Sequence, residues 1–320
     1  MPPPPGNLPE TLGTRDGFLA RYRIRLADYR KTGLAWRVLQ AIYADYRSWH
    51  HELTPIANQL GETLRLAPKV VAFRSRVKDP EHLIEKIIRD SFENGRPSAT
   101  PRNYRVAVKD LIGARALHLF KEDWPIVHAY VRQHWRRYLG GRRPRAKITS
   151  DDPGHIRSMY ARFRCNVRLD KHGYRSVHYV LRLPFQNRSV FAEIQVRTLF
   201  EEAYGEISHA LVYPYKKGNR KLVALSQAVS YAAGTADAWA SILNTFGDWT
   251  DLPRPNSARA REQRTRLADE FELKAEYGGK MSRAFRDKVR LNRKEGDTDR
   301  ALARDMLGIE PRPIRQRARS

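Results

Sequence analysis

The chain has 320 residues, 41% of them hydrophobic, which is enough for one large domain or two small ones around a real core. Lysine and arginine number 60 against 35 acidic residues, and the net charge of +25 indicates polyanionic partners unless an arginine-rich genome explains the excess. A single cysteine excludes an intrachain disulfide. With no signal peptide and no apolar run of membrane-spanning length, we expect a cytoplasmic protein without membrane contacts.

The N-terminal part reads as a short disordered segment followed by helices. Residues 1–14 are rich in proline and glycine, which predicts disorder, and residues 15–66 have helical periodicity. Large apolar residues recur there at spacings of three and four, as in a buried stripe: Trp36, Leu39, Tyr43 and Tyr46. Asp79 and Pro80 have the residue types of an N-cap and a first helical position, so another helix is predicted after them.

The middle of the chain predicts the strands of a sheet. Residues 112–120 are apolar and rich in small side chains, and residues 123–138 predict a helix. Residues 160–169 alternate apolar and polar side chains most regularly, which predicts a strand with Cys165 on its core face. Two more strands are predicted at residues 176–183 and 190–197.

The order of these elements predicts the fold class. Helical patterns return at residues 199–209 and 222–246, so helices precede and follow the strands. We therefore predict an α+β (or α/β) domain over residues 15–250, with a mixed sheet of four or five strands flanked by helices. Residues 251–320 are charged and helix-prone, which predicts a basic helical or flexible extension.

The last two strands carry polar side chains in an order that favours chemistry over mere solubility. Glu193, Gln195 and Arg197 share one face of their strand, opposite an apolar face. Ser176 and His178 likewise share one face of the preceding strand. A solvated face is the alternative, but an acid, an amide and a guanidinium on one face favour a site.

Two earlier segments supply candidates for phosphate and metal binding. A basic cluster can meet the oxygens of a polyphosphate through charge-assisted hydrogen bonds; it contains Arg74, Arg76, Lys78, Lys86 and Arg89. Asp110 leads into the first central strand five residues before Arg115, which fits a Mg²⁺ ligand beside a phosphate clamp. A plain Asp–Arg ion pair is the alternative.

Three further residues fit the recognition of an acceptor. Tyr174 follows the Gly173 turn between Lys171 and Arg175, where its ring could stack on a base. Glu193 could hold the metal together with Asp110 or take a proton from an attacking hydroxyl. Glu202 could accept two N–H donors of a guanine edge, although an acid at a helix N-terminus needs no such role.

Five motifs occur in an order that resembles the synthetase domain of the RelA/SpoT family. They are Arg76-x-Lys78 with Lys86, Asp110-x-x-Gly-x-Arg115, Gly173-Tyr-x-Ser-x-His178, Glu193-x-Gln-x-Arg197 and His209-x-x-x-Tyr213. The resemblance covers residues 70–216. It implies a nucleotidyltransferase-like fold and a reaction in which ATP gives its β,γ-pyrophosphoryl group to the 3′-hydroxyl of GDP or GTP, forming a guanosine alarmone and AMP.

The resemblance also implies the roles of the matching residues. The residues that would hold ATP are Arg76, Lys78, Lys86 and Arg115. Asp110 and Glu193 would be the catalytic acids and the Mg²⁺ ligands. The residues that would bind the acceptor are Lys171, Tyr174, His178, Gln195 and Arg197. Glu202 joins them if its carboxylate accepts the N–H donors of a guanine base. His82 stands where the family usually has serine, and Tyr204 where it often has tryptophan; we expect Tyr204 to serve packing.

The sequence leaves the acceptor and the partners open. No His-Asp dipeptide occurs, so the hydrolase domain of larger members is not expected and the chain resembles a short synthetase-only member. Some short relatives are toxins that modify the 3′ end of tRNA, and others make adenosine alarmones. The segment from Arg132 to Lys147 has seven cations and no acid, which could grip RNA. An inactive RNA-binding module, a cognate antitoxin and a homo-oligomer are further alternatives.

Overall fold

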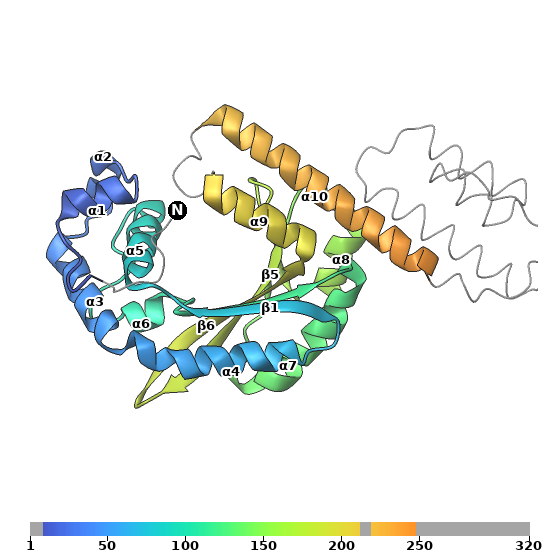
Figure 1. Cartoon of the computed structure of the whole chain (residues 1–320), viewed down its shortest axis with the longest axis horizontal. Coiled ribbons are helices and arrows are strands. Elements are labelled where there is room, and N and C mark those ends of the chain that lie inside the picture. Colours follow the sequence, from blue (N-terminus) through green and yellow to red (C-terminus); the bar gives the residue numbers. More distant parts are fainter. Residues whose placement is uncertain (1–8, 212–218, 248–320) are drawn as a thin grey trace, which may run out of the picture. The chain divides into compact units, whose positions relative to one another are not determined.

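The computed structural model describes residues 9–211 and 219–247 (Figure 1). Of the segment predicted as disordered, residues 1–14, the first eight residues lie outside these ranges, as does the whole predicted extension, residues 251–320. The chain divides into two units, residues 1–233 and 234–320, and the first unit contains the whole sheet together with the helices that precede α10.

Helices form the N-terminal part, as the sequence predicts. They are α1 (Arg15–Arg21), α2 (Leu26–Arg30), α3 (Trp36–Trp49), the 3₁₀ turn η1 (His50–Leu53) and α4 (Thr54–Arg65). Most of the predicted stripe of α3 is core: Leu39, Tyr43 and Tyr46 are at most 1% exposed, whereas Trp36 is only half-buried. After β1 (Val70–Val77), α5 (Pro80–Asn94) begins as predicted, because the Asp79 carboxylate accepts the backbone N–H groups of Glu81 and His82.

The remaining elements are strands and helices in mixed order. They are α6 (Tyr104–Ala107), β2 (Ile112–His118), the 3₁₀ turn η2 (Lys121–Asp123), α7 (Trp124–Leu139), β3 (Arg145–Ile148), α8 (Gly154–Arg162), β4 (Asn166–Leu169), β5 (Ser176–Phe185), β6 (Arg188–Thr198), α9 (Leu199–Leu211) and α10 (Arg220–Gly247). The α+β class and the flanking helices are confirmed.

The sheet is mixed, and within the described ranges it has six strands in the order β1-β2-β6-β5-β3-β4. The pairs β2–β6 and β3–β4 are parallel, and the other three pairs are antiparallel. The predicted count of four or five strands is too low. β1 begins with four consecutive apolar residues instead of alternating, and β3 has only four residues, so neither gives a clear period-two signal.

The predicted strand at residues 160–169 is half wrong. Residues 154–162 form helix α8, because Ile156 and Tyr160, one turn apart, both bury on the same side, and Tyr160 packs edge-on against Trp124 at 4.7 Å between ring centroids. Arg164 then adopts a left-handed φ of 59°, and the strand begins only at Asn166. Cys165 therefore lies before the strand rather than on its core face. It is half-buried, and burial raises the pKa of its thiol to about 12.

The two faces of the sheet differ in chemistry. Helices α4 and α7 cover one face, where Ala114, Tyr179 and Ile194 are buried, and α9 lies on the other (Figure 1). Because side chains alternate along a strand, the residues between these apolar ones point toward α9. Those residues include most of the candidates singled out in the sequence.

Candidate active site

The pairing register brings the candidate residues into two adjacent rows across the face covered by α9. In one row Arg76 lies opposite Gly113, and Gly113 lies opposite Glu193. In the next row the neighbours are Arg74, Arg115, Gln195, His178 and Arg145, taken from five successive strands. Side chains distant in sequence therefore share one polar surface.

Asp110 lies between two lysines at one end of this surface. Its carboxylate is 2.9 Å from Nζ of Lys78 and 3.7 Å from Nζ of Lys86. The backbone N–H of Lys78 donates to the carbonyl oxygen of Leu111 at 2.9 Å, which fixes the end of β1 beside the residue that precedes β2. Oδ1 of Asp110 is buried without a hydrogen bond. The aspartate therefore retains an acceptor position for a ligand.

Glu193, in the middle of β6, is held by three polar neighbours. Its carboxylate is 3.1 Å from Nδ1 of His178, accepts from Nε2 of Gln195 at 2.9 Å, and lies 3.5 Å from Nη2 of Arg145. Burial alone would raise the pKa of Glu193, but the His178 charge, these hydrogen bonds and Lys86 hold that pKa well below its usual range. Glu193 is therefore ionised at neutral pH.

Lys86 connects the two acids. Burial would lower the pKa of its ammonium, but the charges of Asp110, Asp90 and Glu193 raise it. The charges of Asp110, in the loop before β2, and of Glu193, on β6, thus act on the same ammonium. In the part of the chain that the structure describes, no group of three or more His, Cys, Asp or Glu side chains forms a ready-made metal cage.

Helix α9 supplies acids to the arginines of the surface. Nη1 of Arg115 donates to Glu202 at 2.7 Å and also to Glu206, while Nε of Arg197 is 3.1 Å from the other oxygen of Glu202. Glu202 therefore bridges two arginines. A ligand that binds Glu202 or Arg115 has to break these ion pairs and replace them with its own contacts. Arg76, in contrast, is exposed.

Tyr174 stands at the other end of the surface. Its hydroxyl is 3.2 Å from Nε2 of His178 and donates to Oε1 of Gln195 at 3.4 Å. The Arg197 guanidinium and the Lys147 ammonium lie 5.3 and 5.0 Å from its ring centroid. Tyr174, His178, Gln195 and Arg197 are thus brought together. The side chain of Lys171 is exposed on the turn before them.

Several neighbours of the site carry no sequence signal that singles them out. Arg145, Lys147 and Glu206 contact Glu193, Tyr174 and Arg115, respectively. In the sequence Arg145 and Lys147 are two cations among the seven of a basic run, and only the pairing of β3 with β5 places them here. His209 lies near the end of α9, whereas Tyr213 is outside the described residues.

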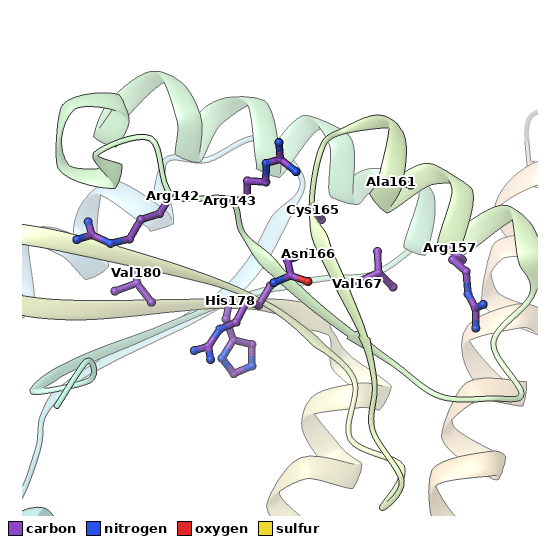
Figure 2. Close-up of a pocket in the computed structure, with 10 residues that line it drawn as sticks. Arg142, Arg143, Arg157, Ala161, Cys165, Asn166, Val167, His178 and Val180 are labelled. Carbon is purple, nitrogen blue, oxygen red and sulfur yellow. The ribbon is translucent and has the colours of Figure 1, made fainter. Parts of the chain in front are cut away.

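A pocket of about 840 Å³ adjoins the Glu193 end of the site. Four arginines line it: Arg142, Arg143, Arg145 and Arg157. Figure 2 shows Arg142 and Arg157 on opposite sides of this pocket, with His178 at its base. Because Arg145 and His178 also contact Glu193, the pocket and the carboxylate share two residues.

Among the helices formed by residues 9–211 and 219–247, none has the length and apolar character required to cross a bilayer.

The comparison with protein families agrees with the resemblance of the motifs. Residues 75–218 match the family model described as the region found in RelA/SpoT proteins. No curated protein matches the chain significantly.

Solved structures with which the chain shares some similarity include the small alarmone synthetase 1 of Bacillus subtilis, at 23% identity and a TM-score of 0.45, over 64% of this chain and 100% of that one. The same enzyme bound to its product pppGpp gives 23% identity and a TM-score of 0.46, over 63% and 99% of the two chains. A GTP pyrophosphokinase family protein of Streptococcus pneumoniae gives 21% and 0.43, over 68% and 96%. Over residues 75–218, the chain is thus similar to the region found in RelA/SpoT proteins.

Proposed function

We propose that this protein is an ATP-dependent pyrophosphotransferase that modifies the 3′-hydroxyl of a guanosine nucleotide, GDP or GTP. The observation that carries the proposal is geometric: Asp110, 3.7 Å from Lys86, lies just before β2, and Gly113 of β2 pairs with Glu193 of β6, inside the region matched by the RelA/SpoT family. Two acids near a half-buried ammonium, beside a row of arginines, are suited to a triphosphate and its attacking hydroxyl.

In the proposed reaction the acceptor 3′-oxygen attacks the β-phosphorus of ATP. A bond forms between that oxygen and the β-phosphorus, the bond from the β-phosphorus to the α,β-bridging oxygen breaks, and AMP leaves. Glu193 orients the hydroxyl and accepts its proton as the new bond forms. The anionic form of Glu193, which the reaction needs, is the form that His178 and Lys86 favour.

The donor side is assigned to the cations around Asp110. Lys78 and Lys86 already neutralise a carboxylate, and Arg76 and Arg115 extend the positive surface along β1 and β2. These groups would take the oxygens of the triphosphate, which carry most of the negative charge in phosphoryl transfer. Arg115 would exchange its ion pairs with Glu202 and Glu206 for phosphate oxygens.

Mg²⁺ fits the two carboxylates of the site. It is a hard cation that binds one or two carboxylates and completes its coordination with substrate phosphates and water. The buried Oδ1 of Asp110, which lacks a hydrogen bond, is a suitable ligand atom, and Glu193 is the second. When bound, the ion would supply charge neutralisation to the triphosphate.

The acceptor side is assigned to the residues around Tyr174. Its ring is flanked by two cations, and stacking of a base on such a ring contributes about 1–3 kcal/mol. His178, Gln195 and Arg197 would orient the ribose and phosphates, and Lys171 would add charge from the turn. That the Glu202 carboxylate accepts hydrogen bonds from the N–H groups of a guanine base stays a prediction.

One assay tests the proposal and its alternatives. The purified protein is incubated with γ-labelled ATP, Mg²⁺ and one acceptor at a time: GDP, GTP, ATP or deacylated tRNA. We expect label on GDP or GTP, because the γ-phosphorus moves with the transferred group. Label on tRNA or ATP alone would contradict the guanosine acceptor, and no transfer to any acceptor would favour an inactive RNA-binding module.

The arginine-lined pocket favours tRNA as the second candidate acceptor. A mononucleotide bound at Tyr174 and Glu193 has few phosphates, whereas an RNA 3′ end continues into further backbone. Arg142, Arg143 and Arg157 surround space that shares Arg145 and His178 with Glu193 (Figure 2). Such a cluster could hold the backbone next to a terminal nucleotide.

A further inference from the structure

The turn before β5 is held by side chains of two helices that the proposed chemistry does not use. Three consecutive backbone carbonyls of this turn each accept a hydrogen bond from α9 or from the part of α10 that belongs to the first unit. The three bonds run from Nε2 of Gln227 to Lys171 at 3.0 Å, from the hydroxyl of Tyr204 to His172, and from Oγ of Ser230 to Gly173 at 2.7 Å. The three carbonyls that directly precede Tyr174 are thus all hydrogen-bonded to helix side chains.

Gly173 brings the turn into direct contact with α10. Its φ of +94° is a conformation that side-chain-bearing residues rarely adopt, and a Cβ there would lie 2.6 Å from Cβ and Oγ of Ser230. The hydroxyl of Tyr204 would be 3.0 Å from the same atom. The helices therefore rest on the backbone of the turn with no room for a side chain between them.

A buried arginine orients the serine. Nη1 of Arg175 donates to Oγ of Ser230 at 2.8 Å and to its carbonyl oxygen at 3.0 Å. Asp152 and Asp151 accept from the rest of the guanidinium, each at 2.7 Å, so this charge is paired although its side chain is only 3% exposed. Because Ser230 accepts from Arg175, its own proton is left for the carbonyl of Gly173.

The N–H groups of the same turn are satisfied by Asp170. Its Oδ1 accepts from the backbone nitrogen of His172 at 2.9 Å and from that of Tyr174 at 3.3 Å. The turn is thus bonded on its carbonyl side by two helices and on its amide side by its own aspartate. These contacts fix the backbone of Tyr174 without any ligand.

We propose that Ser230, Gln227 and Tyr204 are positioning residues for the acceptor: they hold the turn so that the ring of Tyr174 is already oriented to receive a base. This rests on the proposed function, in which Tyr174 contacts the acceptor. Ordering the turn beforehand removes an entropic cost from acceptor binding. The donor-side residues Lys78, Lys86 and Asp110 are held by β1, α5 and the loop before β2, so the effect is confined to the acceptor.

The test compares Ser230→Ala and Gln227→Ala with Lys221→Ala, an exposed residue of the same helix. Hydrogen–deuterium exchange of the peptide spanning residues 170–175 should become faster in the first two variants and stay unchanged in the third. In the transfer assay the KM for the acceptor should rise about 5- to 10-fold, as for the loss of one hydrogen bond. The kcat and the KM for ATP should not change.

A third variant separates the hydrogen bond from the shape of the side chain. Gln227→Glu keeps the size of the side chain but removes the N–H donor, so it should resemble Gln227→Ala in both exchange and acceptor KM. If it behaves like the wild-type protein instead, the bond to Lys171 has no positioning role and the proposal is overturned for Gln227.

The outcomes also separate this inference from the proposed function. A wild-type protein that transfers to no acceptor contradicts the proposed function, whereas the exchange experiment still tests the hold on the turn. Unchanged exchange at residues 170–175 overturns the inference. Faster exchange throughout the first unit, or faster exchange at the turn with an unchanged acceptor KM, shows a purely structural contact and overturns it as well.

Discussion

The two acidic residues of the site are held in different ways. Glu193 is stabilised as an anion by a histidine, an amide and more distant cations, whereas Asp110 is clamped by two ammonium groups. An acid with a strongly lowered pKa is a weak base in the resting state. In the proposed reaction, its role would therefore be to stay unprotonated and to orient the hydroxyl until the bond to phosphorus forms.

Glu193→Gln tests this role. The glutamine keeps the size of the side chain and removes its charge, so kcat should fall by about 10²- to 10⁴-fold, the usual contribution of a general base. ATP affinity, measured by calorimetry, should stay close to that of the wild type. Glu62→Gln, at an exposed ion pair on α4, is the control and should change neither. Weaker ATP binding with normal turnover would contradict the role.

Asp110→Asn should affect both folding and catalysis. It leaves the ammonium of Lys78, which is 8% exposed, without its partner at 2.9 Å, and breaking a buried ion pair from one side costs about 3–5 kcal/mol. Thermal unfolding should therefore occur at a lower temperature than in the wild type.

A double variant separates the two effects of Asp110. Asp110→Asn combined with Lys78→Met removes both charges and should recover most of the lost stability. Neither the single nor the double variant should transfer, because both lack the proposed metal ligand and the double variant also lacks Lys78, which is assigned to ATP. A single Asp110→Asn protein that is as stable and as active as the wild type would remove Asp110 from the site.

At the scale of the elements, the sequence predicted those helices and strands whose residue pattern is regular. The faces of β5 and β6 follow from strict alternation, so the shared surface of Glu193, Gln195 and Arg197 was predictable. The helix α5 followed from its cap. These are local signals, which need no knowledge of the partner strands.

The rest depended on long-range pairing. Residues 160–162 alternate like a strand but form the end of α8, because Tyr160 finds an aromatic partner in Trp124 and tertiary packing overrides the local pattern. Arg145 reaches Glu193 only through the pairing of β3 with β5. Likewise, no periodicity relates Ser230 and Gln227 to a turn more than fifty residues before them.

The buried histidine of α7 gives the core a pH dependence. Nδ1 of His128 is 2.9 Å from the hydroxyl of Tyr179, and burial, together with the charge of Arg132, lowers the pKa of His128 to about 4. The unfolded chain, with an ordinary histidine pKa near 6.5, binds more protons than the folded chain between these values. The stability that this neutral histidine contributes is complete above pH 6.5 and decreases as the pH falls toward 4.

His128→Gln should remove this dependence. We compare the free energy of unfolding, from denaturant titrations, between pH 6.5 and 4. As the pH falls, it should decrease in both proteins, and the slope of the wild type should be steeper than that of the variant by up to about 1.4 kcal/mol per pH unit. Equal slopes in both proteins would show that His128 is not the titrating group. His134→Gln, an exposed histidine on the same helix, should keep the wild-type slope.

At the scale of the whole molecule, the dominant property is the net charge of +25. Charge of this size attracts any polyanion, so RNA binding by itself would say little about the site. What matters is whether the positive charge next to Glu193 contributes more than the same charge elsewhere. Arg142, Arg143 and Arg157, which line the pocket of about 840 Å³, allow that comparison.

Replacing these three arginines with glutamine should weaken RNA binding and flatten its salt dependence. Each lost phosphate contact reduces the slope of log K against log salt by about 0.7 for a single strand, so three contacts amount to about 2. Arg37, Arg96 and Arg102 are exposed arginines of other segments, and their replacement changes the net charge by the same amount. Fluorescence anisotropy at several salt concentrations should give the control variant nearly the wild-type slope. If both triple variants lose the same slope, RNA binds through the general charge of the surface, and the pocket gives no reason to prefer tRNA over a guanosine nucleotide as the acceptor.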